Sequence, residues 1–328
     1  MSSQNDADST RLSYWLNWRV FLCEIWVLAP VVGALFIIWK YEDRSVETRA
    51  NDDDDDDDDG KGRQDLSVDD VWRPCLNQIH PGWLLGFRVL AFCFLLATTI
   101  VRLLVRGWSI FYYYTQWTFT LLTIYFGLGS LLSVYGCSQC GRQQSMRVTT
   151  DRSGTVPENG HRQPFIEGEG MNSTKNRKIA GARVVSKALD SCIHLFQIIF
   201  QMSAGAIVLT DCIYWGVIFP YLSIQDYDLN FMTVNLHSSN LVLLLCDTAL
   251  NCLRFPLFRI SYFVLWTGSF VVFQWIIHAC ISVRWPYPFL DLSSPMAPLW
   301  YLTVALMHLP CYGLFALLVR IKHILLPQ

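Results

Sequence analysis

The hydrophobic and polar positions of this chain alternate in long blocks rather than in short periods. Polar segments separate apolar runs of about twenty residues, the length with which an α-helix crosses the hydrocarbon core of a bilayer. The pattern predicts an all-α, polytopic membrane helix bundle of about seven transmembrane helices. The expected spans lie at about residues 20–39, 84–104, 110–134, 195–218, 233–251, 260–282 and 297–319.

Two long hydrophilic segments divide these runs. Residues 40–83 include eight consecutive aspartates, which repel one another and predict a solvated, disordered loop. Residues 137–187 are rich in Arg, Lys, Gly, Ser and Asn without periodicity, and they predict a second disordered loop. We therefore expect residues 1–83 to form an N-terminal membrane helix plus the acidic loop. Residues 84–328 then form a six-helix membrane core.

Composition supports a membrane protein and narrows its chemistry. Hydrophobic residues make up 52% of the chain and charged residues 16%, whereas soluble proteins average about 25% charged residues. Most of the eleven cysteines, Cys252 among them, lie in or beside apolar runs, where a thiol is usually a small hydrophobic group. No Gly-rich phosphate loop and no basic nucleic-acid-binding fold is present, so nucleic acid is excluded as a partner and no cofactor is expected.

Lysine and arginine predict the orientation. With seven spans, nineteen of these residues fall on the side of the two long loops and the C-terminus. Five fall on the opposite side, with Arg88 left out because it lies within a span. The positive-inside rule then places the long loops and the C-terminus in the cytoplasm and the N-terminus outside or in the lumen. We expect the protein to lie in the endoplasmic reticulum or the plasma membrane. The glycosylation sequon at Asn172 falls on the cytoplasmic side, so we expect it to be unmodified.

The fifth run carries a polar stripe. At about 100° per residue, its polar positions share an arc of roughly 80° that also includes Leu244. The opposite face is apolar. Polar groups in hydrocarbon must turn inward and find partners, so the stripe predicts either a functional site or an interhelical hydrogen-bond seam. Its polar members are Thr233, His237, Asn240, Asp247 and Asn251.

The topology brings polar residues from four spans to similar depth. Thr115 enters from the outer side on the third span, and His237 does so on the fifth. Asp211 and His278 lie near the outer ends of the fourth and sixth spans. Four polar groups on one level predict a site in the outer half of the bundle.

Three segments in this region carry a family resemblance. They are YYYTQWTF at 112–119, NLHSSNLVLLLCD at 235–247 and WIIHACISVRWPYPFLDL at 275–292. Their order and spacing resemble the androgen-induced and rolling-stone family of polytopic membrane proteins, over about residues 84–320. The androgen-induced branch hydrolyses fatty-acid esters of hydroxy fatty acids, and the resemblance implies Thr115 and His237 as its threonine and histidine. That branch has a second histidine where this chain reads Val234-Asn235-Leu236.

The implied chemistry needs further groups around the pair. A histidine base activates a hydroxyl nucleophile, and a third group orients the imidazole. Asn240, Asp211 and Asp247 are the candidate orienting or supporting residues, and Asn235 and His278 are candidate donors to an oxyanion. The expected partners are membrane lipids, with a long-chain lipid ester as substrate.

Other classes of function remain as alternatives. A zinc hydrolase would draw on His237, His278, His308 and Asp211, but the chain has no HxxxH or HExxH pair, and we expect no metal. A transporter would show repeated or broken helices, and a receptor would carry coupling motifs at its cytoplasmic ends. The main alternative is a non-enzymatic membrane organiser or fusion-related protein, in which the polar stripe is structural.

Overall fold

The chain folds as a bundle of long helices, because backbone groups within a bilayer must satisfy one another. The computed structural model describes residues 9–51, 71–75, 79–152, 170–220 and 235–326. Within these residues, six helices are long and apolar enough to cross a membrane. They are built from α2 (Trp18–Asn51), α4 (Pro81–Arg106) with η1 (Gly107–Tyr112), α5 (Tyr114–Arg152), α6 (Gly170–Ile213) with η2 (Tyr214–Ile218), η4 (Leu257–Arg259) with α10 (Ile260–Cys280), and α11 (Ala297–Leu325).

The fifth apolar run forms a shorter element than the other six. It consists of η3 (Asn235–Ser239), a π-helical turn, followed directly by α9 (Asn240–Leu250). Sixteen helical residues extend about 24 Å at 1.5 Å each, less than the hydrocarbon thickness of about 30 Å. Thr233 lies outside the described residues, so the predicted seventh span is described only from Asn235 onward.

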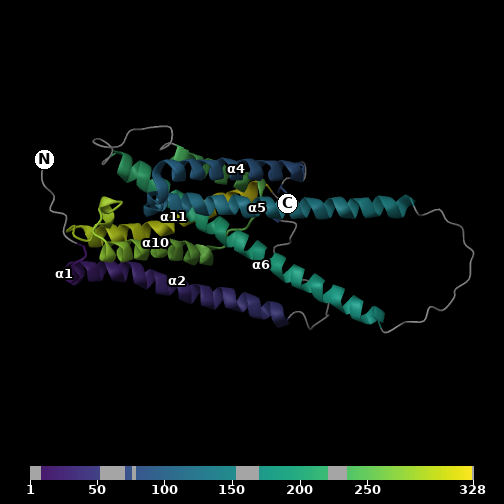
Figure 1. Ribbon diagram of the computed structural model, residues 1–328, viewed down its shortest axis with the longest axis horizontal. Coiled ribbons are helices and arrows are strands. Elements are labelled where there is room, and N and C mark those ends of the chain that lie inside the picture. Colours follow the sequence, from purple (N-terminus) through teal and green to yellow (C-terminus); the bar gives the residue numbers. More distant parts are fainter. Residues whose placement is uncertain (1–8, 52–70, 76–78, 153–169, 221–234, 327–328) are drawn as a thin grey trace, which may run out of the picture.

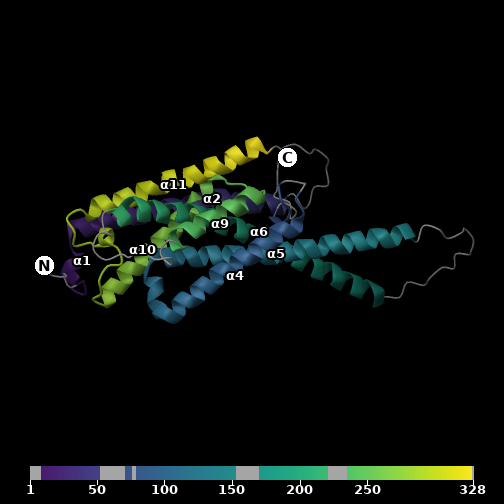
Figure 2. The same cartoon turned by 90° about the horizontal axis from the view of Figure 1, so that it is seen from above.

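Helix α6 lies at the centre of the bundle and contacts α5, α9, α10 and α11. In its most apolar 18-residue stretch 72% of the residues are buried, whereas in the corresponding stretch of α2 only 11% are buried. Helix α2 packs on α10 and α11, and α4 packs on α5 and α9. Figures 1 and 2 show α4 and α2 on opposite sides of the bundle, with the short α1 (Leu12–Trp15) preceding α2. The N-terminal helix is therefore a peripheral addition to a core of the other helices.

Helices α5 and α6 extend beyond the membrane-spanning bundle (Figure 1). Helix α5 continues to Arg152 and α6 begins at Gly170, so the segment expected to be a disordered loop at 137–187 is helical at both ends. A helix that is already formed adds each further residue easily, since nucleation is the costly step. The aspartate run at 52–59 and residues 153–169 lie outside the described residues.

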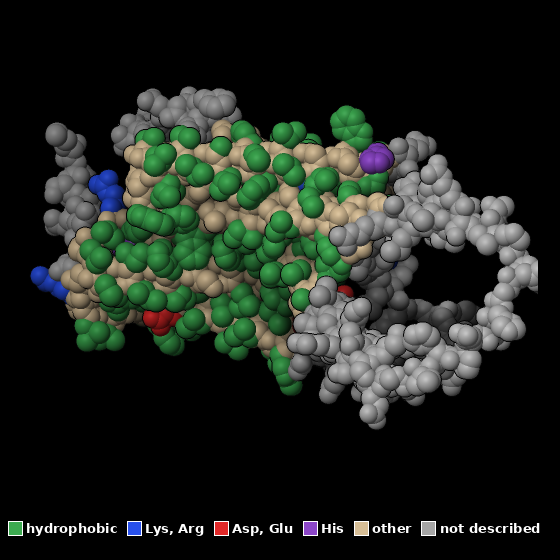
Figure 3. Space-filling model, turned by 45° about the vertical axis from the view of Figure 1, so that its right-hand side comes forward, with side chains coloured by type: hydrophobic (Ala, Val, Ile, Leu, Met, Phe, Trp, Pro, Cys, Tyr) green, Lys and Arg blue, Asp and Glu red, His purple; other side chains and the backbone are tan. Residues whose placement is uncertain are grey.

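Burial confirms that the polar stripe faces inward. His237, Asn240, Asp247 and Asn251 are all buried. On the opposite face, Val242, Cys246 and Ala249 are exposed, which suits contact with lipid. Apolar side chains also cover much of the outer surface (Figure 3), as the bilayer requires.

Candidate functional site

Thr115 lies in the first turn of α5, where the chain turns back from η1 into the bundle. Its side chain is buried. The Thr115 side chain shares a cavity wall with Tyr287, which lies on the link between α10 and α11. Burial raises the pKa of Tyr287 to about 12, so this phenol is a neutral O–H group at physiological pH. Tyr287 belongs to one of the recognised sequence segments but was not predicted as a site residue.

His237 lies on the π-helical turn η3 and is buried. Its ring stacks on Tyr214, with centroids 3.6 Å apart and planes 4° from parallel. Tyr214 begins η2, a second π-helical turn, and its neighbour Trp215 donates a 3.2 Å hydrogen bond from Nε1 to the His237 carbonyl. Nδ1 of His237 has no hydrogen-bond partner among the described residues. Two π-turns therefore meet at this imidazole, and such turns occur frequently at functional sites.

One cavity joins the two residues. Thr115 and His237 both line a space of about 50 Å³ between α5, α6, η2, η3, α10 and α11. A cavity holds one water molecule when about 10–15 Å³ is open to the centre of a water-sized sphere. The space beside Thr115 and His237 therefore has room for a small polar group. The other lining residues are mostly apolar: Tyr114, Leu209, Thr210, Ile213, Tyr214, Ile218, Thr267, Phe270, Val271, Tyr287, Phe289, Leu290 and Val304.

A second cavity lies directly beside the first. It has a volume of about 60 Å³ and lies between α2, α10 and α11, with His308 in its wall. The two cavities have in common the residues Thr267, Val271, Phe289, Leu290 and Val304. The N-terminal helix thus completes an apolar chamber that is separated from the Thr115–His237 cavity by a single layer of side chains.

Three of the proposed supporting residues lie near this cavity without lining it. Asn240 donates from Nδ2 to the Leu236 carbonyl at 3.0 Å, and its Oδ1 has no partner among the described residues. Asn235 begins η3, and its carbonyl accepts a hydrogen bond from Ser239. Asp211 is half-buried on α6, and its Oδ2 has no hydrogen-bond partner among the described residues. No described hydrogen bond joins any of the three to the His237 ring.

His278 lies at the end of α10, where its contacts join that helix to neighbouring segments. Its Nε2 shares a 2.9 Å hydrogen bond with the Tyr112 hydroxyl, and its Nδ1 a 2.7 Å hydrogen bond with the Gln274 carbonyl. Its ring stacks on Trp285 at 3.6 Å, and Ser9 donates to its carbonyl at 2.8 Å. Both ring nitrogens are engaged, and the side chain does not line the Thr115–His237 cavity.

Asp247 belongs to a buried charge network near the C-terminus of α9, whereas His237 lies just before the N-terminus of that helix. Arg88 donates from Nε to Asp247 Oδ1 at 2.9 Å, and both side chains are fully buried. Asn251 donates to the same carboxylate at 2.8 Å, and Tyr125 donates to its Oδ2. Ten helical residues separate Asp247 from His237, about 15 Å along the axis. Asp247 therefore neutralises a buried arginine and lies away from the cavity.

Arg88 lies within the second predicted span, and its contacts there are visible only in the structure. It is fully buried and donates through Nη1 to the Val71 carbonyl at 2.8 Å and to Ser133 Oγ at 3.0 Å. The signal was present in the sequence. Arg88 lies seven residues into its helix, and one acidic residue, Asp247, lies deep in another span.

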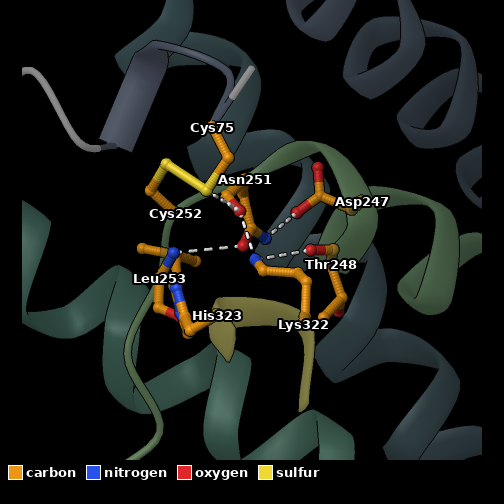
Figure 4. The surroundings of a disulfide bond; sticks show 8 residues. All are labelled: Cys75, Asp247, Thr248, Asn251, Cys252, Leu253, Lys322 and His323. Atoms are coloured by element: carbon orange, nitrogen blue, oxygen red, sulfur yellow. Dashed lines mark hydrogen bonds between the residues drawn. A yellow bond between two sulfur atoms is a disulfide. The ribbon is translucent and has the colours of Figure 1, made fainter. Parts of the chain in front are cut away.

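The C-terminus of α9 is also tied down covalently (Figure 4). Cys252 forms a disulfide with Cys75, although its position beside an apolar run predicts a small hydrophobic side chain. The Cys75 N–H donates to the Leu250 carbonyl at 2.9 Å. Lys322 of α11 donates to the carbonyls of Thr248 at 2.9 Å and Asn251 at 2.5 Å, which have no partner within the ending helix. This end of α9 is a structural anchor.

The described residues contain no group of three or more His, Cys, Asp or Glu side chains that could hold a metal ion. The zinc-hydrolase alternative therefore has no ligand set in this part of the chain. The polar groups in the cavity wall are instead one imidazole, three threonine hydroxyls and three phenols: His237, Thr115, Thr210, Thr267, Tyr114, Tyr214 and Tyr287.

The fold and these residues define the class of protein. It is a multi-pass, α-helical membrane protein whose bundle encloses a small cavity with polar side chains in its wall. Comparison with protein-family models, curated proteins and solved structures finds no match to this chain.

Proposed function

We propose that this protein is a membrane hydrolase of long-chain lipid esters, with Thr115 as nucleophile and His237 as base. The observation that carries the proposal is that both residues line one cavity, although they are 122 positions apart in the chain. The resemblance to the androgen-induced and rolling-stone family supports the same pair, and membership of that family is part of the proposal.

The proposed reaction has two halves. Thr115 Oγ attacks the ester carbonyl carbon while its proton passes to His237, and the imidazolium then protonates the departing alkoxide. This step yields an acyl-threonine and a free alcohol. Water next attacks the acyl-threonine, with His237 again as base, and releases a fatty acid. The neutral phenol of Tyr287, which lines the same cavity as Thr115, is the candidate donor to the developing oxyanion.

The surroundings of the pair suit a lipid substrate. The cavity wall is largely apolar, and the adjoining chamber beside α2 is bounded by Trp26, Val27 and Pro30 from that peripheral helix. An acyl chain entering between the helices would find an apolar path toward Thr115. The basic residues of the long loops favour an orientation with the C-terminus in the cytoplasm and the N-terminus outside.

The second candidate function is a non-enzymatic membrane organiser. The observation in its favour is the Arg88–Asp247 network, in which the polar residues at one end of the fifth run bond to one another. In that case the Tyr214–His237 stack is likewise a packing contact. The two proposals differ in whether Thr115 is chemically activated.

Labelling with a fluorophosphonate, which reacts with activated hydroxyl nucleophiles, distinguishes them. Full-length protein in membranes is compared with Thr115→Ala and His237→Ala. Thr118→Ala is the matched control, because Thr118 lies one turn further along α5 and its hydroxyl donates to the Tyr114 carbonyl at 3.2 Å. We expect labelling of the wild type and the control only. An unlabelled but folded wild type, or labelling that survives Thr115→Ala, would overturn the hydrolase proposal.

A further inference from the structure

A third hollow lies at the end of the bundle where α4 turns into α5. It has a volume of about 380 Å³, several times that of either cavity described above. Two arginines and a set of aromatic residues dominate its wall. The lining residues are Arg102, Arg106, Trp108, Ser109, Ile110, Phe111, Tyr112, Tyr113, Phe273, Ile277 and Val283.

The two arginines give the hollow a positive charge that no carboxylate among the described residues pairs with. They lie four positions apart on α4 and so share one face of the helix, where like charges repel. Arg102 donates to the amide oxygen of Gln116, which is neutral. Arg106 is exposed. Among the described residues, neither arginine forms an ion pair with a carboxylate, so no described acidic side chain offsets the two positive charges of the hollow.

A turn in the chain builds the hollow around these charges. Gly107 ends α4 with a φ of 65°, a left-handed conformation that glycine adopts without steric cost. The chain then folds into η1, and Ser109 Oγ donates to the Arg106 carbonyl at 2.7 Å. Trp108 and Phe111 stack with their centroids 5.9 Å apart. Aromatic residues of this kind gather at the level of lipid headgroups.

The hollow also borders an apolar helix surface. Leu104 and Val105, next to the arginines, are 80% and 76% exposed. In Figure 3 a few separate lysine and arginine side chains lie at one end of the described surface, and the rest of that surface is largely apolar. A ligand with a charged group and long apolar chains can therefore satisfy the hollow and the helix face together.

We propose that this hollow binds the phosphate of an anionic glycerophospholipid. Arginine offers planar, paired N–H donors that match phosphate oxygens, and the volume exceeds the needs of a lone carboxylate or phosphate. The acyl chains then lie along the Leu104–Val105 face of α4. Arg102 and Arg106 lie on the side of the molecule opposite the long loops, where basic residues are few. A phosphate site there gives these two residues a role. It does not depend on the hydrolase proposal.

Lipid titration tests the site directly. Full-length protein in a neutral detergent is titrated calorimetrically with short-chain phosphatidylglycerol, phosphatidylcholine, inorganic phosphate and laurate. We expect saturable binding of phosphatidylglycerol, with affinity roughly tenfold above that for the other three, because only this ligand joins an anionic phosphate group to two apolar chains. Binding of laurate or inorganic phosphate as tight as that of phosphatidylglycerol would overturn the assignment to a phospholipid.

Variants locate the binding. Arg106→Glu changes an exposed side chain, so folding is retained, and it should remove the preference for phosphatidylglycerol. Arg106→Lys keeps the charge without the paired donors and should weaken binding less than Arg106→Glu does. Arg19→Gln is the matched control, since Arg19 lies near the start of α2 and outside the hollow. Equal affinity in the wild type and Arg106→Glu would exclude this site.

Discussion

At the scale of single residues, the bundle contains a fully buried ion pair between Arg88 and Asp247. Both side chains are fully buried, and the carboxylate also receives hydrogen bonds from Asn251 and Tyr125. A buried pair is a modest source of stability while intact. Removal of one partner is costly, because a charge then remains without compensation in a medium of low dielectric constant.

Asp247→Ala should therefore lower the free energy of unfolding by about 3–5 kcal/mol, measured by denaturation in mixed detergent micelles. Asp190→Ala, at an exposed site on α6, is the control and should change stability little. The double variant Arg88→Met with Asp247→Leu should recover most of the loss, because it removes both charges. A double variant no more stable than Asp247→Ala would contradict this account of the pair.

At the scale of helices, close contact between α6 and α10 holds the centre of the bundle. A Cβ atom added at Gly205 would lie 2.5 Å from Cδ1 of Phe263. Glycine here permits two backbones to approach, as small residues do between membrane helices. The same contact positions Thr210 on α6 and Thr267 on α10, which both line the Thr115–His237 cavity.

Gly205→Leu should destabilise the protein by about 1–3 kcal/mol, because the added side chain overfills a packed interface. Gly313→Leu on α11 is the control, since nothing lies within 4 Å of the Cβ position there. Thermal unfolding in detergent compares the two variants. A Gly205→Leu protein as stable as the control would show that the helices separate without cost.

The disulfide anchors the C-terminus of α9, and it predicts how many cysteine thiols react with a maleimide. Nine of the eleven cysteines are free and two are paired. Purified, air-oxidised protein, denatured and treated with polyethylene glycol maleimide, should therefore carry nine adducts, and eleven after reduction. Cys75→Ser should carry ten with or without reduction, because Cys252 is then a free thiol. Eleven adducts on the unreduced wild type would exclude the pairing.

At the scale of the whole molecule, the disulfide and the basic loops bear on the orientation in the membrane. Cys75 lies at the end of the hydrophilic segment 40–83, on the side that carries nineteen lysines and arginines. The positive-inside rule puts that side in the cytoplasm, where glutathione and thioredoxin keep thiols reduced. The proposed orientation therefore implies that the pair is reduced in cells and oxidises on isolation.

Two measurements examine this orientation. Asn172 should carry no glycan, whereas a glycosylation tag appended to the N-terminus should be modified. Cells quenched in acid before maleimide treatment should yield eleven adducts, unlike the air-oxidised protein. A glycan on Asn172 together with a disulfide trapped in cells would invert the topology.

Apolar runs and the positions of polar residues in them were enough to predict the helix bundle and the inward-facing stripe on the fifth run. This is because a bilayer leaves the backbone few alternatives to a helix and forces polar side chains inward. Only the tertiary structure decided which polar residues meet. It brings Thr115 and His237 to one cavity, while Asp247 pairs with Arg88 and His278 bonds to Tyr112. Helical periodicity fixes a residue's face on its own helix, but its partner depends on the rotation and depth of the neighbouring helices.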